Sequence, residues 1–388
     1  MLTTVFWIFA AIIVYTYFGY TSILFFISLF TRRKSTKYLY ADQLPDVTLL
    51  VAAYNEREII NDKIANSFSL NYPKDKLKHL WITDGSDDDS EKILSKIEGV
   101  QVLHQSAREG KTAALNRAMK QVKTPVTIFS DANSMLSPDS VYQMVLSLNS
   151  KNVGCVAGEK RILSNKKDKA PGAGEGFYWN YESILKHLES QVGSTLGAAG
   201  ELYAIRTRLY SPPLNNVILD DFVVTLSIAQ KGYKLAYQPN AVATESSSLN
   251  IREELKRKIR IASGAFQVLF GIPSLLNIFK HFFLSFQYFS HKVLRWLFVP
   301  FSILGILLTN IAIVYKSMQF DVYFIFAILQ AIFYLLVISG FLLKNRNIRF
   351  KFIFLPYYLI LMNYSLVVGL ARFIKGGQKA AWEKSKRS

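Results

Sequence analysis

Long uncharged apolar stretches at both ends constrain this chain more than any other feature. No Asp, Glu, Lys or Arg occurs in residues 2–30, 297–315, 322–343 or 352–371. About 20 apolar residues suffice to cross a bilayer as a helix, and a helix satisfies its own backbone hydrogen bonds in lipid. The sequence therefore predicts one membrane helix within residues 1–31 and about three within 297–375.

The first apolar segment could instead be a secretory signal peptide. It is too long for one, it lacks a basic start, and it has no small-residue cleavage site. We therefore interpret it as a retained anchor. The single Cys155 is compatible with a reducing compartment, because one cysteine cannot form a disulfide within the chain.

Basic residues cluster beside the apolar segments, at 32–34 and at 344–351, within a net charge of +18. Because cytoplasmic loops are enriched in Lys and Arg, both clusters place the polar middle of the chain in the cytoplasm. Membrane anchoring and anionic lipid explain this charge more simply than nucleic acid does. The basic tail 376–388 also favours the cytoplasm, whereas three crossings after residue 296 would place it outside. Either the segment containing Pro356 is re-entrant, or one C-terminal segment does not cross.

The polar middle, residues 45–250, alternates strand and helix patterns. Apolar, β-branched runs predict strands at 47–53, 77–83, 100–103 and 125–130, and the segments between them predict helices at 58–70, 90–97 and 111–122. Such alternation is typical of a parallel sheet built from βαβ units. The following residues predict a strand at 153–158, a loop at 164–176, helices at 177–191 and 222–231, a strand at 201–206, and basic, amphipathic interfacial helices at 251–296.

Two acidic motifs are placed where chemistry is expected. Asp131 and Asn133 follow the strand at 125–130, and ligands of parallel sheets bind beyond the carboxyl ends of strands. Two oxygen-bearing side chains at this spacing can face one hard cation, although Asp and Asn also favour ordinary turns. Asp220 and Asp221 begin a predicted helix, where simple N-capping is the alternative to catalysis.

Six motifs, in order, resemble those of the family 2 glycosyltransferases. They are Ala-Ala-Tyr-Asn-Glu at 52–56, Asp-Gly-Ser-Asp at 84–87, Gly-Lys-Thr-Ala-Ala-Leu-Asn at 110–116, Ser-Asp-Ala-Asn at 130–133, Gly-Ala-Ala-Gly-Glu-Leu-Tyr-Ala-Ile-Arg at 197–206 and Asp-Asp-Phe at 220–222. The chain is most similar to the membrane-integrated branch that contains cellulose, hyaluronan and poly-β-1,6-N-acetylglucosamine synthases. The resemblance covers roughly residues 45–270.

The resemblance implies an α/β GT-A domain with a Rossmann-like, mostly parallel sheet, a UDP-sugar donor, Mg²⁺ or Mn²⁺, and inversion at the anomeric carbon by single displacement. It implies a bacterial inner-membrane enzyme with a glycan or lipid-linked acceptor and partner proteins of polysaccharide assembly. Carried onto this chain, it makes Asp221 the general base and Asp131 and Asn133 the metal ligands. The implied donor-binding residues are Ala53, Tyr54, Glu56, Asp84, Lys111, Asn116, Asp131 and Arg260. The implied acceptor-side residues are Trp179, Gly197, Gly200, Glu201 and Asp220.

Those acceptor-side roles have alternatives in the residues themselves. Trp179 could equally pack in the core or at the interface. Gly197 and Gly200 let the backbone approach a ligand closely, but both are also ordinary turn residues.

The chain departs from the family pattern at two positions. Asn133 stands where a second aspartate is usual, so this ligand is neutral. The processive synthases carry Gln-x-x-Arg-Trp, and here residues 257–261 read Arg-Lys-Ile-Arg-Ile. Arg260 keeps the phosphate-binding arginine, but Ile261 offers no aromatic face to a sugar ring. A later Trp296 is interpreted as an interfacial anchor of its helix.

Three functions remain open at this stage. The first is extension of a polysaccharide or lipid-linked glycan, and the second is addition of a single sugar to a lipid carrier, which Ile261 favours. The third is a transporter or scaffold whose α/β domain only binds nucleotide. The apolar segments contain no charge that would mark an ion or substrate pathway, which argues against the third.

Overall fold

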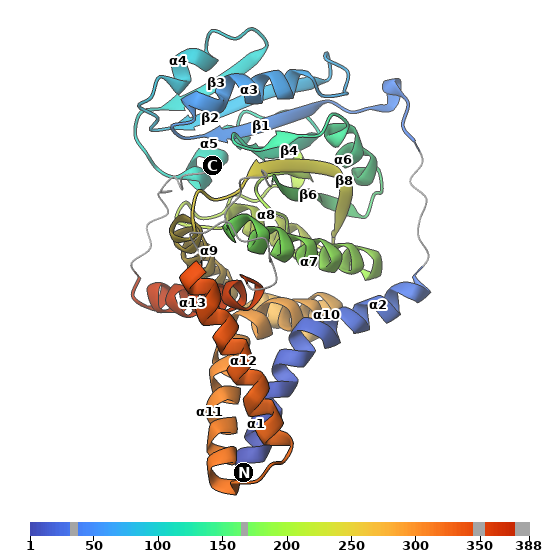
Figure 1. Cartoon of the computed structure of the whole chain (residues 1–388). Helices are drawn as coiled ribbons and strands as arrows, with labels where there is room; N and C mark the ends of the chain where they lie inside the picture. The colour runs from blue at the N-terminus through green and yellow to red at the C-terminus, as the bar shows by residue number, and fades with distance from the viewer. Residues whose placement is uncertain (32–37, 164–169, 344–353, 377–388) are drawn as a thin grey trace.

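The computed structural model describes residues 1–31, 38–163, 170–343 and 354–376. The basic clusters at 32–34 and 344–351, like the tail from 377 onward, lie outside the described residues. Figure 1 shows an α/β domain standing on a stalk of apolar helices, with further helices lying across the junction. The domain carries the site, and the stalk supplies the apolar surface.

One eight-stranded sheet forms the domain, in the order β3-β2-β1-β4-β7-β6-β8-β5. β3, β2, β1 and β4 are mutually parallel, whereas β7 runs antiparallel to both β4 and β6, and β5 runs antiparallel to β8. The predicted GT-A arrangement with a mostly parallel sheet is confirmed. The strands are β1 (Val47–Ala53), β2 (Leu77–Asp84), β3 (Val100–Gln105), β4 (Val126–Asp131), β5 (Met135–Leu136), β6 (Val153–Leu163), β7 (Tyr203–Arg206) and β8 (Lys234–Ser246).

Helices cover both faces of the sheet, which explains why β1 is buried along its whole length. Its successive side chains point to opposite faces, so Leu49 and Val51 pack in one core while Leu50 and Ala52 pack in the other. The first core is closed by α3 (Arg57–Phe68), α4 (Ser90–Leu94) and α6 (Ser140–Leu148), and the second by α5 (Lys111–Met119) and α8 (Asp220–Gln230).

The structure corrects the sequence-based boundaries at two places. The helix α7 (Ala170–Val192) begins seven residues earlier than expected, so residues 170–176 are helical rather than part of a loop; residues 164–169 lie outside the described structure. The strand β8 is not predicted by the sequence pattern, because Pro239 interrupts it and a proline cannot donate to the ladder. The sheet accommodates the proline at an irregularity, where the partners of β6 jump from Gln238 to Val242.

Four helices in the described residues are long and apolar enough to cross a membrane: Leu2–Phe30, Ile278–Ser317, Val322–Leu343 and Phe354–Ile374. The first comprises α1 (Leu2–Val14), a π-helical turn and α2 (Tyr20–Phe30), and the second comprises α10 (Ile278–Gln287), a π-helical segment and α11 (Val299–Ser317). In Figure 1, α1, α11 and α12 (Val322–Leu343) project together as the stalk. Only Gly340 is buried in α12, so its apolar surface suits lipid. These helices make the chain a membrane protein.

The fourth apolar helix, α13 (Phe354–Ile374), lies beside α9 (Ile251–Gly271) at the junction rather than along the stalk (Figure 1). The Tyr358 hydroxyl donates to Glu254 at 3.2 Å near the start of both helices. Gly369 lies against Ala262 so closely that an added Cβ would be 2.5 Å from its Cβ. The two helices therefore run in parallel over most of their length.

Candidate active site

The carboxyl ends of three parallel strands meet at one edge of the sheet. In register, Ala52 of β1 lies beside Asp131 of β4, and Ala53 lies beside Thr83 of β2, one residue before Asp84. The polar residues that follow each strand are therefore brought together, as the sequence predicts. This edge borders a cavity of about 1140 Å³.

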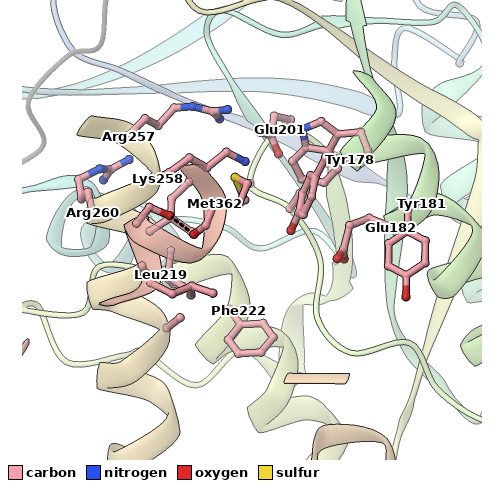
Figure 2. Close-up of a pocket in the computed structure, with 18 of the residues that line it drawn as sticks. Tyr178, Tyr181, Glu182, Glu201, Leu219, Phe222, Arg257, Lys258, Arg260 and Met362 are labelled. Carbon is pink, nitrogen blue, oxygen red and sulfur yellow. Dashed lines mark hydrogen bonds between the residues drawn. The ribbon is translucent and has the colours of Figure 1, made fainter. Parts of the chain in front are cut away.

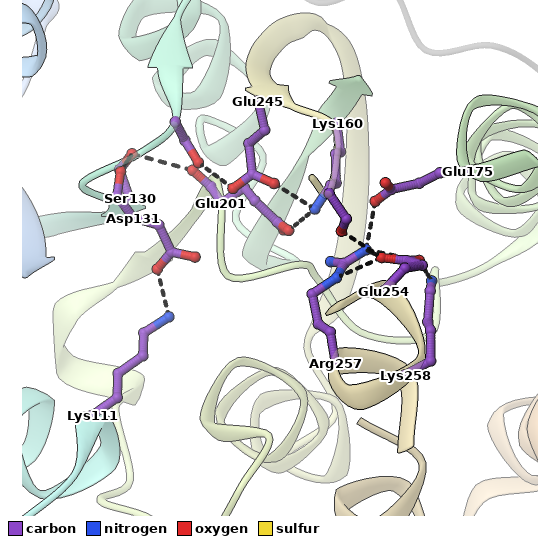
Figure 3. Close-up of polar contacts among 12 residues, drawn as sticks. Lys111, Ser130, Asp131, Lys160, Glu175, Glu201, Glu245, Glu254, Arg257 and Lys258 are labelled. Atoms are coloured by element: carbon purple, nitrogen blue, oxygen red, sulfur yellow. Dashed lines mark hydrogen bonds and ion pairs between the residues drawn. The ribbon is translucent and has the colours of Figure 1, made fainter. Parts of the chain in front are cut away.

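Asp131 is held at this edge by a lysine. Its Oδ1 accepts a hydrogen bond from Lys111 Nζ at 2.6 Å (Figure 3). Burial, together with the carboxylates of Glu201 and Glu245, raises the pKa of Asp131, while Lys111 opposes that shift. The group thus stands in a region with surplus negative charge, which a cation would offset.

Gly200 marks the point where the charged groups converge. A Cβ placed there would be 3.0 Å from Lys111 Nζ, 3.4 Å from Asp221 Oδ2 and 3.8 Å from Asp131 Oδ2. The absence of a side chain keeps this space open. Gly197, in the same loop, has a φ of +80° and packs against Phe222, where an added Cβ would clash with the ring at 2.3 Å. Both glycines therefore shape the site directly.

Asp221 is the residue that we expect, from the sequence, to be the general base. It lies in the first turn of α8, and its Oδ1 accepts from the backbone N–H of Phe222 at 2.7 Å. Burial and the neighbouring Asp220 raise the pKa of Asp221 to about 7, although Lys111 opposes the shift. A carboxylate with a pKa near the working pH is partly ionised before the reaction and is basic enough to accept a proton from a hydroxyl.

We expect kcat/KM to fall by about tenfold per pH unit below an inflection near 7, because the base must be deprotonated to act. Asp220→Asn should move this inflection to lower pH, since Asp220 is one of the groups that raise the pKa of Asp221. A pH profile of turnover by both proteins checks the prediction. An unchanged inflection in Asp220→Asn would contradict the assigned coupling.

Asp220 also has an unused hydrogen-bonding atom. It is 5% exposed, and its Oδ2 is buried without a partner among the described residues. A buried carboxylate oxygen in this state costs free energy unless a ligand supplies a donor. Asp220 lines the same cavity as Asp131, Glu201 and Asp221, so a hydroxyl-rich acceptor could satisfy it there.

A second, small space adjoins the first. Ala53, Tyr54, Asp84 and Lys111 line it, and Arg108 covers it with its guanidinium 3.7 Å from the centre of the Tyr54 ring. Asp84 accepts from the backbone N–H groups of the two residues before α5, the second of them at 2.6 Å. Its carboxylate thus holds the loop before α5.

One residue of the predicted donor set lies apart from the others. Asn116 lines neither cavity. Its amide donates to Pro213 O at 2.8 Å and to Asn215 Oδ1 at 3.0 Å, and its Oδ1 accepts from Tyr210. Asn116 therefore positions the segment that leads to α8. Apart from Asn116, the predicted site residues that do not line the small space line the large cavity. Glu56, Asn133 and Arg260 are among them.

Buried ion pairs fix α9 beside the site. Arg257 pairs with Glu254 at 3.0 Å and with Glu175 at 2.5 Å (Figure 3). Lys160, on β6, pairs with Glu201 and with Glu245. The sequence does not single out Lys160, because β6 extends past its predicted end and only the pairing with β8 turns this position inward.

The cavity also contains aromatic side chains whose place the sequence does not determine. Trp179 lines it, and its Nε1 is buried without a partner in the described structure. Trp296 lines it too, with its ring 5.8 Å from that of Phe222. The interpretation of Trp296 as a simple interfacial anchor therefore misses its position beside the start of α8, since no local signal shows which helix folds over the site.

Comparison with known proteins identifies the family. The family described as "Glycosyltransferase like family 2" matches residues 45–264. The chain belongs to the family 2 glycosyltransferases. It is therefore a transferase, and the predicted family is confirmed.

Two curated relatives of this glycosyltransferase are named poly-beta-1,6-N-acetyl-D-glucosamine synthase. The one from Staphylococcus aureus strain COL is 26% identical over 239 residues, which is 59% of this chain and 56% of the relative. The one from Staphylococcus epidermidis is 25% identical over 238 residues, 58% of this chain and 56% of the relative. The aligned region thus spans little more than half the length of these relatives.

A solved structure confirms the fold over almost the whole glycosyltransferase. It is described as mannosyltransferase PcManGT from Pyrobaculum calidifontis in complex with GDP-Man and Mn²⁺. The TM-score is 0.67 at 19% identity, covering 97% of this chain and 100% of the other. The likeness therefore includes the apolar helices as well as the sheet.

Proposed function

We propose that this glycosyltransferase transfers a sugar, with inversion, from a UDP-sugar to a growing polysaccharide or a lipid-linked glycan. The observation that carries the proposal is the convergence of Asp131, Lys111 and Asp221 around the open position at Gly200. One end of this arrangement suits a diphosphate, and the other suits a hydroxyl that must lose a proton. Inversion follows from a single displacement in which the acceptor attacks the donor sugar opposite the leaving group.

The residues at the end of β4 fit a divalent cation. Asp131 supplies a partly buried carboxylate whose pKa is raised by desolvation and by nearby carboxylates, and Asn133 lines the same cavity. Mg²⁺ and Mn²⁺ accept such oxygen ligands and complete their coordination with phosphate and water. When bound, the cation would neutralise charge on the departing diphosphate. Lys111 and Arg260 add positive charge to the same cavity.

The acceptor side depends on Asp221. Its carboxylate takes the proton of the acceptor hydroxyl as the oxygen bonds to the anomeric carbon and the bond to UDP breaks. Positioned carboxylates of this kind contribute about 10²–10⁴ in rate. Glu201 lies close enough to raise the pKa of Asp221 further, which makes its carboxylate a stronger proton acceptor.

Chelation should abolish transfer, and Asn133→Asp should increase the affinity for the cation. The substitution adds a carboxylate where the chain supplies an amide, and carboxylates bind hard cations more strongly. We expect at least about a tenfold lower metal concentration for half-maximal UDP release, because one tenfold step needs only about 1.4 kcal/mol. A Mn²⁺ titration of both proteins after treatment with EDTA measures it. Activity that survives complete chelation would contradict the role of the metal.

A second candidate function is the addition of one sugar to a lipid carrier. Ile261 lines the cavity at the position where processive relatives have the acceptor tryptophan, and the cavity continues among the stalk helices. Both observations favour an acceptor that reaches the site from the membrane. Product length distinguishes this function from polymer extension.

The fold also supports an orientation. If α1, α11 and α12 cross and α13 stays at the junction, the catalytic domain and the C-terminal tail lie on one side, which agrees with the basic clusters in the sequence. We place this side in the cytoplasm, at the bacterial inner membrane, where UDP-sugars are available. Under this proposal the conflict between three C-terminal crossings and the basic tail does not arise.

The direct test is UDP release by the detergent-purified full chain over a panel of UDP- and GDP-sugars with Mn²⁺ or Mg²⁺. The names of the curated relatives put UDP-N-acetylglucosamine first in the panel. Release from one donor, with sugar found in a product, supports the proposal. Donor binding without turnover, even with membrane lipid extract added, would instead support a nucleotide-binding scaffold.

A further inference from the structure

The cavity that begins at the catalytic carboxylates continues between the apolar helices. Figure 2 shows part of its lining, with Tyr178 from α7, Phe222 from α8 and Lys258 from α9. The far walls come from α1, α11, α12 and the π-helical turn after α1. They carry mostly aliphatic and aromatic side chains: Ile13, Phe18, Ile303, Ile306, Phe333 and Tyr334. One continuous space thus joins a polar reaction centre to the membrane helices.

This space also borders the surface that faces lipid. Phe18 is one of its lining residues, and the side chain is 70% exposed. A ligand that lies in the cavity can therefore contact the apolar surface of the stalk as well as the interior. Such an opening suits a molecule that arrives from the bilayer.

Polar groups are few in this apolar part, and their amide N–H groups donate within the protein, although Asn310 Oδ1 and Asn363 Oδ1 have no partner among the described residues. Gln330 accepts from Asn310 Nδ2 at 3.1 Å and donates to the carbonyl of Ile306 at 3.4 Å. Asn363 Nδ2 donates to Leu359 O within its own helix. A passing glycan would need many hydrogen bonds from these walls, whereas a hydrocarbon chain needs none. The lining therefore fits the tail of a lipid.

Several cations gather around one aromatic ring of the cavity lining. Lys160, Lys186 and Lys258 surround the half-buried Trp179 ring at 4.8, 5.5 and 5.9 Å. Lys258 has a carboxylate partner in Glu254 at 3.6 Å, and Lys160 has two. In the described structure Lys186 has no carboxylate partner, although it is only 7% exposed.

Burying an uncompensated ammonium is costly, so a site of this kind favours an anionic ligand. Lys292 and Arg295 also line the cavity. Both of these share the single carboxylate of Glu182. Among the described residues, Lys186 and Arg260 line the cavity without a carboxylate partner. Arg260 is assigned to the donor, and Lys186 is the one beside Trp179.

We propose that this cavity binds the acceptor as a lipid whose sugar is attached through a phosphate or diphosphate. The chain would lie between α1, α11 and α12, the phosphate beside Lys186, and the sugar between Trp179 and the catalytic carboxylates. The inference rests on the proposed transferase function and names its acceptor class. The partnerless Trp179 Nε1 and Asp220 Oδ2 provide a donor and an acceptor for sugar hydroxyls.

The transfer balances with these groups. A hydroxyl of the lipid-linked sugar loses its proton to Asp221, and its oxygen forms a bond to the anomeric carbon of the donor. The bond from that carbon to the diphosphate breaks, and UDP leaves with the electron pair. The lipid phosphate takes no part in the bond changes and anchors the acceptor beside Lys186.

Photolabelling tests the site without requiring turnover. The full chain in nanodiscs is irradiated with a diazirine-bearing farnesyl phosphate, and labelled peptides are mapped by mass spectrometry. We expect labels on α11 and α12, and we expect unlabelled farnesyl phosphate to prevent this labelling. Farnesol should compete at least about tenfold less effectively, and inorganic phosphate should not compete, because both the head and the chain contribute to affinity. Equal competition by farnesol would overturn the phosphate assignment, and competition by inorganic phosphate would overturn the lipid.

Matched variants on one helix separate the cavity from the general lipid surface. Ile306→Trp fills the apolar part of the cavity, whereas Leu308→Trp places the same ring on an outward position that is 56% exposed. Labelling should fall at least about fivefold in the first and persist in the second, because only the first removes space from the site. Equal labelling of both variants would overturn the proposal.

A kinetic arm separates this inference from the proposed function. Farnesyl-diphosphate-linked N-acetylglucosamine should stimulate UDP release more than free chitobiose does, and Lys186→Gln should raise its KM with little change in kcat, with recovery in Lys186→Arg. UDP release that responds equally to both acceptors would overturn the lipid acceptor while keeping the transferase. Specific photolabelling without UDP release from any donor would overturn the transferase while keeping the lipid site.

Discussion

Asp221→Asn is expected to lower turnover by about a thousandfold, which is within the range attributed to general-base catalysis. The amide has the same shape and can still accept a hydrogen bond from the backbone N–H of Phe222. It cannot take a proton from the acceptor hydroxyl at any pH near neutrality. The loss should therefore appear in kcat, measured as UDP release with saturating donor and acceptor.

An exposed aspartate provides the control. Asp75 lies on the surface of the same domain, away from both cavities, so Asp75→Asn makes the same chemical change without touching the site. It should keep the rate of the unaltered protein. Retention of more than about a tenth of the turnover in Asp221→Asn would show that another group accepts the proton.

Arg257→Met is expected to cost about 3–5 kcal/mol of folding free energy, the range observed when one partner of a buried ion pair is removed. Arg257 is 8% exposed and pairs with Glu254 and Glu175. Removing it leaves both buried carboxylates without their closest cation. The measurement is thermal or denaturant unfolding of the detergent-purified chain.

The adjacent lysine is a matched control on the same helix. Lys256 is also paired, with Glu253 at 3.1 Å, but its side chain is 57% exposed. Lys256→Met should therefore change stability by no more than about 1 kcal/mol. Equal losses of unfolding free energy in the two variants would show that the ion pairs of Arg257 do not stabilise the position of α9. If adding Glu254→Gln to Arg257→Met restores part of the lost stability, the unpaired carboxylate of Glu254 is a cause of the loss.

Much of the sheet could be predicted because its central strands are buried on both faces. Continuous apolar runs identify β1, β2 and β4 to within a residue or two, and the alternation with helices indicates their parallel direction. The order of the later strands could not be predicted in this way. β8 contains a proline and pairs across an irregularity, so its pattern becomes clear only beside β6.

The site was predictable as far as its residues follow strand ends and helix starts. Asp131 and Asp221 fall into this class, and the structure brings them to the same glycine. Asn116 shows the limit, since its motif matches while its amide serves a neighbouring loop. Lys63 shows another limit. Lys63 is fully buried near the turn at Asp131, and its ammonium donates a hydrogen bond to Ser130 Oγ at 2.8 Å. Burial lowers the pKa of Lys63 to about 7, but the sequence of its helix gives no sign that this lysine is buried.

If the nucleobase of the donor lies on Tyr54, as the resemblance implies for donor binding, the stack of Arg108 on that ring would compete with it. In that arrangement uracil would have to displace the guanidinium before it could lie on the ring, and the guanidinium would return when UDP departs. An exposed contact of this type is worth about 0.5–1 kcal/mol, so it weakens the binding of donor and of product by the same factor of about two to five. Selectivity among sugars is unaffected by such a factor. What changes is the donor concentration at which the enzyme saturates, together with its resistance to inhibition by accumulated UDP.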